Sequence, residues 1–293
     1  MQPVTLDLDG SLGPMPGGRV LALRGHAGTL RFACSSRALR RFAANLENDM
    51  PSEHGTVFTG SGDFHHLSLP LIARAAKRHG PLQVVVFDNH PDNMRFAFGV
   101  HCGSWVRRAA ALPGVAHVHL VGITSNDIGL AHAWENRLRP LFARRLTYWS
   151  CGVDTSWARR IGLRHACRAF DDMQDLLQAF AATMAISTQP VYLSIDKDVL
   201  SIDDARTNWD QGRMREHELV AAITALRGRI VDSDITGEVS EARYRQWWKR
   251  ALTALDRQPS IPAECLRRWQ ADQHALNLRL LPVIDAAHAR AAN

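Results

Sequence analysis

The chain has 293 residues, 46% of them hydrophobic and 22% charged, which is typical of a globular protein and argues against a disordered or fibrous one. Its formal net charge is +6, but the arginines are dispersed, without the basic run or stripe that nucleic-acid binders carry. No apolar window approaches the length of about eighteen residues that a membrane helix needs, and the N-terminus lacks the pattern of a secretory signal. The five cysteines are scattered and include no CxxC pair. We therefore expect a cytoplasmic protein with reduced thiols that binds neither a membrane nor a nucleic acid.

Short apolar runs alternate along the chain with longer amphipathic stretches. The runs predict strands at 19–24, 56–60, 83–88, 117–123, 146–151, 166–170, 191–196 and 230–236. The stretches predict helices at 34–47, 68–79, 102–112, 172–185, 214–227, 241–257 and 262–280. Several strands are β-branched and apolar on both faces, as in a parallel sheet covered on both sides. We therefore predict an α/β fold, a three-layer αβα sandwich around a parallel sheet of roughly eight strands. It would form one domain over residues 1–293, with a helical C-terminal segment from about 241 to 293.

Histidines and acids follow four of the predicted strands, directly where each strand ends. In open α/β sheets, ligands bind beyond the carboxyl ends of the strands, so these residues are candidates for a site. They are Asp63, His65 and His66 in GSGDFHHLSLP, Asp88, His90 and Asp92 in DNHPD, Asp196 and Asp198 in DKD, and Glu238 in GEVSE.

The spacing within two of these segments predicts which side chains point together. Residues two apart in an extended segment face the same way, so Asp88 points with His90 and Asp196 with Asp198. A proline turns the chain after His90, which lets Asp92 return to the same place. Taken alone, each segment is typical of a polar turn or cap. Their conjunction at the ends of several strands is what predicts a metal site.

The number of candidate ligands favours two metal ions over one. The candidates are His65, Asp88, His90, Asp92, Asp196 and Asp198, with His66 as the alternative to His65. Carboxylates and imidazoles suit Mn²⁺, and two ions about 3.5–4 Å apart share ligands in such sites. Four carboxylates that converge without cations would repel one another and take up protons. We therefore predict two Mn²⁺ ions as cofactors.

The segments GSGDFHHLSLP, DNHPD, SIDKDVLSID and GEVSE resemble, in this order, the motifs of the ureohydrolase (arginase/agmatinase) family. The resemblance extends from about residue 56 to 241 and is that of a divergent member. It implies the arginase/deacetylase-like fold and a pair of Mn²⁺ ions with a bridging hydroxide as nucleophile. It also implies a homo-oligomer, because members of the family are often trimers or hexamers.

The resemblance assigns a role to each metal ligand. His65 matches the histidine of the first family motif, because the step from His65 to Pro70 equals the family's step from that histidine to a proline. Asp88 and Asp196 would bridge both metals. The remaining ligands would each bind one metal: His90, Asp92 and Asp198.

Catalysis and substrate binding are assigned by the same resemblance. The segment HCGSWVRRA makes His101 the counterpart of a proton-shuttling histidine that also contacts the substrate. Glu238 would hold the substrate guanidinium, and Asp127 in GITSND would hold a substrate amino group. Asp198 would hold the nucleophile and pass on its proton. As structural alternatives, His101 is a packed histidine, and Glu238 is a partner of one of the arginines at 243–245.

Several positions depart from the family pattern. Phe64 is an extra residue in the first motif, Thr124 and Ser125 replace an Arg-Asp pair, and the loop after DNHPD is short. The aspartate-proline pair expected after SxDxD is also missing. The resemblance therefore implies hydrolysis of a guanidino C–N bond to urea and an amine. The substrate would be a small guanidino compound or a peptide arginine rather than free arginine.

Three other readings of the same residues stay open. One is a formimino- or acyl-amine hydrolase on the same fold, and another is a non-catalytic family member that binds metal. The third, a nucleic-acid binder, rests only on the pI of about 9.4.

Overall fold

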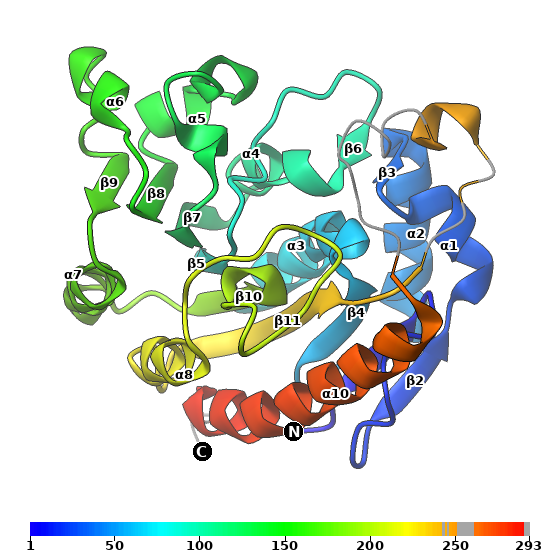
Figure 1. Ribbon diagram of the computed structural model, residues 1–293. Helices are drawn as coiled ribbons and strands as arrows, with labels where there is room; N and C mark the ends of the chain where they lie inside the picture. Colours follow the sequence, from blue (N-terminus) through cyan, green and yellow to red (C-terminus); the bar gives the residue numbers. More distant parts are fainter. Residues whose placement is uncertain (242–243, 245, 251–260, 290–293) are drawn as a thin grey trace.

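A parallel sheet of nine strands forms the centre of the computed structural model, which describes residues 1–241, 244, 246–250 and 261–289 (Figure 1). The strands follow one another across the sheet in the order β2-β1-β4-β11-β10-β5-β7-β8-β9. Their bounds are β1 Val4–Asp7, β2 Arg19–Ala22, β4 Val57–Ser61, β5 Leu82–Phe87, β7 Val115–Ile123, β8 Leu146–Cys151, β9 Cys167–Phe170, β10 Val191–Asp196 and β11 Ile230–Glu238. Two further short strands, β3 Ala33–Cys34 and β6 Val100–His101, pair antiparallel outside this sheet.

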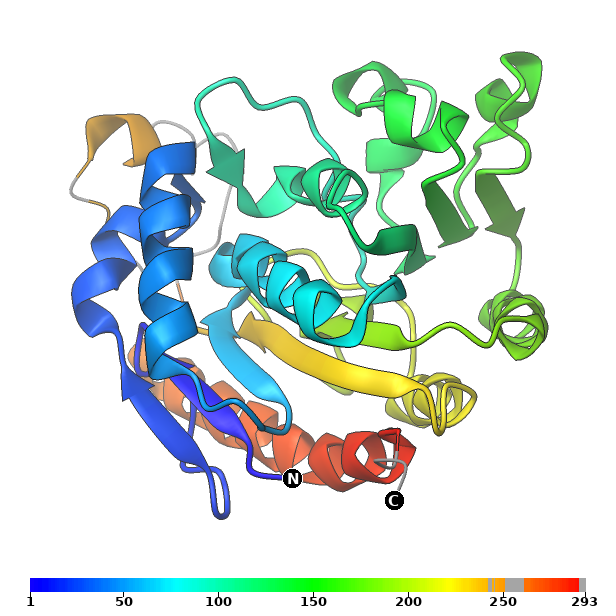
Figure 2. The same ribbon diagram turned by 180° about the vertical axis from the view of Figure 1, so that it is seen from behind.

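Helices cover both faces of the sheet. Helices α7, α8 and α10 lie on one face, and α2, α3 and α4 lie on the other (Figures 1 and 2). The helix bounds are α1 Arg24–Leu30, α2 Ser36–Asp49, α3 Ser68–His79, α4 Val106–Ala109, α5 Arg139–Phe142, α6 Ser156–Arg160, α7 Met173–Ile186, α8 Glu216–Thr224 and α10 Ala263–Ala287. In the described part of the chain, no helix combines the length and hydropathy needed to cross a membrane.

The apolar runs of the central strands supply two separate cores. Val84 and Val86 of β5 belong to the core under α2, α3 and α4, whereas Val85 and Phe87 belong to the core under α7, α8 and α10. All four side chains are fully buried. A strand between two cores must be apolar on both faces, so its sequence shows a continuous run instead of an alternating pattern.

The strand order places the polar strand ends side by side. β4, β11, β10 and β5 are neighbours, and all run parallel. Their registers align Ile195 with Phe87 and Asp196 with Thr236, and they align Ser61 with Glu238. The segments that follow these four strands therefore meet at one edge of the sheet, where a ligand site is expected.

The predicted α/β sandwich is confirmed, with one strand more than expected. All eight predicted strands are present, and β1 adds a ninth between β2 and β4. The predicted helix at 102–112 is wrong in length, since a 3-10 turn at Cys102–Ser104 precedes the short α4. The helix predicted at 262–280 extends to Ala287 despite a proline at position 282. Of the helix predicted at 241–257, residues 247–250 are helical and 251–257 lie outside the described residues.

Candidate metal centre

A cavity of about 450 Å³ opens at the carboxyl edge of the sheet, above the four central strands. The six predicted metal ligands line it, together with residues from the loops that follow. The residues outside the predicted ligand set that face it include Met94, His101, Asp127, His132, Glu135, Trp209 and Asp210. Of these, the sequence singled out only His101 and Asp127 as site residues.

Two groups of ligands lie at the bottom of this cavity, and they share Asp88. His65, Asp88 and Asp92 form one group, and Asp88, His90 and Asp198 form the other. In the first group, His65 Nδ1 lies 3.2 Å from Asp88 Oδ2 and 3.0 Å from Asp92 Oδ2. In the second, His90 Nδ1 lies 3.0 Å from Asp198 Oδ2 and 3.7 Å from Asp88 Oδ1. His90 and Asp92 thus belong to different groups.

Asp196 lies beside the first group at the end of β10. Its Oδ2 is 3.4 Å from His65 Nδ1, and its Oδ1 accepts a hydrogen bond from the backbone N–H of Asp198. Gly237 has a φ of 90° here, and a Cβ at that position would lie 2.5 Å from Asp196 Oδ1. A glycine is therefore required for β11 to approach this carboxylate.

The charged groups of the cluster shift one another's pKa values. Burial and the negative charge of Asp88 raise the pKa of Asp92 to about 7. Burial and Asp88 likewise raise the pKa of Asp198 to about 7. Burial lowers the pKa of His65, but the carboxylates of Asp88 and Asp92 outweigh it and hold that pKa well above the usual value. Without metal, protons on these groups would compensate the negative charge.

The donor set fits divalent cations such as Mn²⁺. Imidazole nitrogens and carboxylate oxygens converge on two places, with no thiolate among the groups. In addition, His65 Nδ1 and Asp88 Oδ2 are buried and make no hydrogen bond. Buried polar atoms are nearly always paired, so two such atoms facing each other indicate that a third partner belongs between them.

Partners outside the cluster hold several of its members in place. Trp105 Nε1 donates to Asp92 Oδ2 at 2.6 Å, and Asp92 adopts a positive φ of 42°. His65 Nε2 lies 3.1 Å from Ser194 Oγ. His90 Nε2 lies 2.8 Å from Asp210 Oδ1, in the loop after β10. Such partners fix the orientation of metal-binding rings. The sequence did not single out Asp210 or Trp105, because neither stands at a fixed spacing from the ligands.

His66 points away from the cluster, whereas its neighbour His65 points into it. Burial lowers the pKa of His66 to about 3, and neither of its ring nitrogens has a hydrogen-bond partner. His66 belongs to neither ligand group. Of the two alternatives for the first-motif ligand, the structure therefore places only His65 with the acids.

His101 and Asp127 both face the cavity, as the sequence predicted for substrate-contacting residues. The backbone N–H of Gly103 donates to His101 Nδ1 at 3.0 Å, which leaves Nε2 as the protonated nitrogen of the neutral ring. Phe96 stacks on this ring with centroids 5.3 Å apart. Burial lowers the pKa of His101 to about 4, so the ring is neutral near pH 7.

Glu238 is not brought to the cavity. It is buried, and its Oε1 accepts hydrogen bonds from Lys197 Nζ and, at 2.7 Å, from Asn277 Nδ2 of α10. Lys197 stands between the ligands Asp196 and Asp198 and is itself fully buried. The other oxygen of Glu238, Oε2, is buried and makes no hydrogen bond among the described residues. The structural partner of Glu238 is thus Lys197, and the arginines at 243 and 245 lie outside the described residues.

Comparisons with known proteins match most of the chain. A model of the arginase family matches residues 25–236, a span that contains all six ligands. A Thermotoga maritima protein described as uncharacterized is 29% identical over 205 residues, which are 70% of this chain and 65% of that protein. This chain therefore covers slightly less than two thirds of that relative's length.

Solved structures share the fold. A formiminoglutamase variant from Trypanosoma cruzi, solved with Mn²⁺, has a TM-score of 0.56 at 12% identity, over 98% of this chain and 93% of that chain. An agmatine ureohydrolase from Thermoplasma volcanium has a TM-score of 0.55 at 13% identity, over 97% and 88%. At such identities the likeness shows the arrangement of the backbone and leaves the substrate open.

Proposed function

This chain belongs to the arginase family, and from that premise we propose that its cavity is the active site of a binuclear manganese hydrolase. The proposed reaction is the hydrolysis of a C–N bond in a guanidino group, with urea and an amine as products. The observation that carries the proposal is the pair of buried ligand groups that share Asp88 at the bottom of the cavity.

Each of the two ligand groups would bind one cation. His65, Asp88 and Asp92 would hold one, and Asp88, His90 and Asp198 would hold the other. Asp196 is assigned as a second shared carboxylate, because it lies beside His65 and Asp198. Two Mn²⁺ ions bound there would supply a hydroxide at neutral pH by lowering the pKa of water.

Asp198 and His101 are assigned to the proton steps. Asp198 faces the cavity and would accept the proton of the attacking water. His101 would donate a hydrogen bond from Nε2 to the leaving nitrogen, since its Nδ1 is engaged by Gly103. A full proton transfer from His101 requires the imidazolium form. The ring would then have to give up that contact with Gly103.

The other residues that line the cavity favour a positively charged substrate without a free carboxylate. No lysine or arginine lines it among the described residues, whereas Asp127, Glu135 and Asp210 do. A carboxylate on the substrate would find no lysine or arginine to pair with among the described lining residues and would lie near these acids. A blocked or peptide arginine, or a guanidino amine, therefore suits the cavity better than free arginine.

A second candidate function follows from the pairing of Glu238 with Lys197. If that pair persists during turnover, the reacting group is not held by a buried carboxylate and need not carry a guanidinium charge. A formimino or acyl-amine group then fits as well. The same two-cation site would hydrolyse its C–N bond.

The test is product formation by Mn²⁺-loaded protein across a substrate panel. The panel contains agmatine, arginine, a peptide arginine, formiminoglutamate and N-acetylated diamines, with urea, formamide and acetate as the measured products. Urea from a guanidino amine or peptide arginine supports the first candidate, and formamide or acetate alone supports the second. Asp198→Asn should abolish turnover, while Asp154→Asn, remote from the cavity, should not. Absence of all three products with metal bound would contradict both.

A further inference from the structure

A second cavity, of about 490 Å³, is lined by four arginines and is separate from the metal centre. Arg107 comes from α4, Arg139 from α5, Arg137 from the segment before α5 and Arg145 from the residue before β8. Alanines and one proline complete the lining, in which no acidic residue takes part among those that the structure describes. The two cavities have no lining residue in common.

The four guanidinium groups have no acidic partner in the described part of the chain. Within the described ranges, no carboxylate oxygen lies within 4.0 Å of any of them, although other arginines such as Arg24, Arg31 and Arg279 each have one. The cavity is thus lined by four arginines whose charges no neighbouring acid among the described residues offsets. Like charges that line one cavity repel one another, and a bound anion would relieve that repulsion.

Two of the arginines are also short of hydrogen-bond partners. The Nε atoms of Arg107 and Arg145 are buried and make no hydrogen bond, although Arg145 Nη2 donates to the Val115 carbonyl. Burial lowers the pKa of Arg107, and the charges of Arg108 and Arg137 lower it further. Buried donors on charged groups are costly to leave unpaired, so the cavity favours a ligand that offers acceptor oxygens.

We propose that this cavity binds a small polyanion that carries at least two phosphate or carboxylate groups. A guanidinium offers forked donors that match the oxygens of either group, and four of them exceed what one singly charged ion satisfies. The volume is within the range of about 300–1,000 Å³ that small-ligand sites occupy. The cavity therefore suits a compact ligand such as an oligophosphate or a tricarboxylate.

The site is close to the metal centre but can be studied without it. Asn93 follows the ligand Asp92, and its Nδ2 donates to the Arg137 carbonyl at 2.8 Å, while the Arg137 N–H donates to the Asn93 carbonyl at 3.0 Å. The arginine side chains are not metal ligands. Binding can therefore be measured on protein freed of divalent ions, independently of the proposed reaction.

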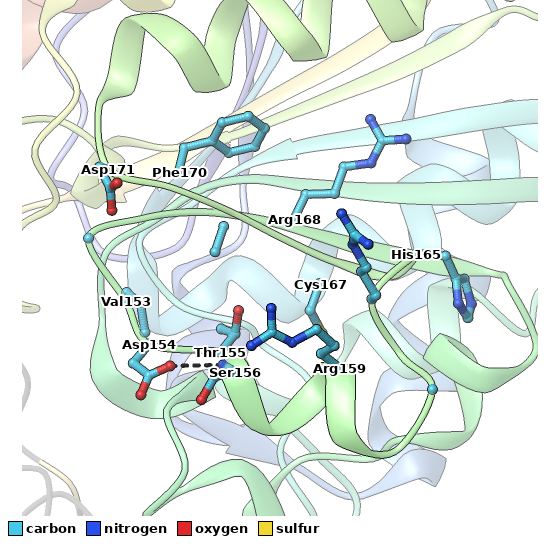
Figure 3. A pocket seen from close by; sticks show the side chains of 14 residues that line it. Val153, Asp154, Thr155, Ser156, Arg159, His165, Cys167, Arg168, Phe170 and Asp171 are labelled. Carbon is cyan, nitrogen blue, oxygen red and sulfur yellow. Dashed lines mark hydrogen bonds between the residues drawn. The ribbon is translucent and has the colours of Figure 1, made fainter.

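A third cavity, of about 1040 Å³, provides a matched control (Figure 3). Arginines line it too, but Asp154 and Asp171 line it with them. Arg168 donates to Thr183 Oγ1 at 3.0 Å and lies over the Trp149 ring. The positive charge of this third cavity is thus partly balanced by its two aspartates, and Arg168 already has contacts within the protein. Removing Arg159 and Arg164 from this cavity changes the net charge of the protein as much as removing two arginines from the proposed site.

The experiment is calorimetric titration with sodium tripolyphosphate and, separately, with citrate. The protein is passed over a chelating resin first and kept at an ionic strength of about 0.15 M, which screens diffuse attraction. We expect saturable binding of at least one of the two anions at one site. Arg137→Gln/Arg139→Gln should weaken it at least about tenfold, because each charge-assisted contact is worth about one such factor. Both side chains are exposed, so this variant should fold.

Two further variants distinguish binding at this cavity from nonspecific attraction of anions to a positively charged protein. Arg159→Gln/Arg164→Gln in the third cavity should change the affinity less than about twofold. Ala111→Glu places a carboxylate among the four arginines at an exposed position and should abolish binding. An equal loss in the control pair, or no saturable binding of either anion by the wild-type protein, would overturn the proposal. Neither result depends on which substrate the metal centre hydrolyses.

Discussion

Asp88 differs in charge from the other carboxyl groups of the metal centre. Burial raises its pKa, but the neighbouring imidazoles of His65 and His90 outweigh that effect and hold the pKa well below its usual value. Asp92 and Asp198, with pKa values of about 7, and Asp196, whose pKa burial and Asp198 raise well above its usual value, are the groups that take up protons instead. Asp88 is therefore the permanent anion between two imidazoles, which suits a ligand shared by two cations.

Replacing Asp88 by asparagine should remove Mn²⁺ binding at both positions, because both ligand groups contain it. We expect affinity to fall well over about a hundredfold, beyond the loss typical of an outer partner. Asp210→Asn, which changes the partner of His90 Nε2 and of Asn89 Nδ2 but no predicted ligand, should cost about 10–100-fold. Elemental analysis and calorimetry measure both. Equal losses for the two variants would contradict a shared role for Asp88.

The affinity for Mn²⁺ should rise with pH through neutrality. Asp92 and Asp198 must lose their protons to bind metal, and both have pKa values of about 7 in the metal-free protein. Binding at pH 6 should therefore release more protons than binding at pH 8. Calorimetry in buffers of different ionisation enthalpy counts these protons. Equal proton release at the two pH values would show that the carboxyl groups are ionised without metal.

At the scale of elements, Lys197 joins three parts of the chain. It stands in the turn after β10, pairs with Glu238 at the end of β11, and donates to Asn277 Oδ1 of α10 at 3.1 Å. All three side chains are buried. The contact ties the C-terminal helix to the segment that carries Asp196 and Asp198.

Lys197→Met should destabilise the protein by about 3–5 kcal/mol, because it leaves the Glu238 carboxylate buried without its cation. The double variant Lys197→Met/Glu238→Gln should recover much of that loss. Urea denaturation measures the free energy of unfolding of each variant. If the double variant is no more stable than Lys197→Met alone, the loss comes from packing and not from the unpaired charge.

How far the sequence predicts the fold and the site depends on how local each feature is. The strand 83–88 and the ligands after it follow from one segment, because its apolar run and its DNHPD turn are contiguous. β1 alternates apolar and polar residues in VTLD, so it lacks the continuous apolar run by which a strand such as 83–88 is recognised. The Lys197–Glu238 pair joins residues 41 positions apart, and no spacing rule predicts it.

At the scale of the whole molecule, the two cores bury polar side chains that bear on stability in acid. His119 of β7 is buried, and Trp149 Nε1 donates to its Nδ1 at 3.3 Å. Burial, together with the charges of His117, Arg168 and Arg229, lowers its pKa to about 3. The folded protein therefore holds this ring neutral well below the pH at which an unfolded chain protonates it.

His119 should lower the stability of the metal-free protein as the pH falls from about 6.5 toward 3. In that window the unfolded chain binds a proton at His119 that the folded protein excludes. Each pKa unit between the two states lowers the free energy of unfolding by about 1.4 kcal/mol. Above about pH 6.5 neither state is protonated, so the penalty vanishes. His119→Gln should make the fall in unfolding free energy shallower by a few kcal/mol between pH 7 and 4, whatever its effect at pH 7.

His217→Gln, which removes an exposed ring, should leave the slope unchanged. Denaturation at a series of pH values measures the slopes, and parallel curves for wild type and His119→Gln would mean that the fold does not keep this ring neutral.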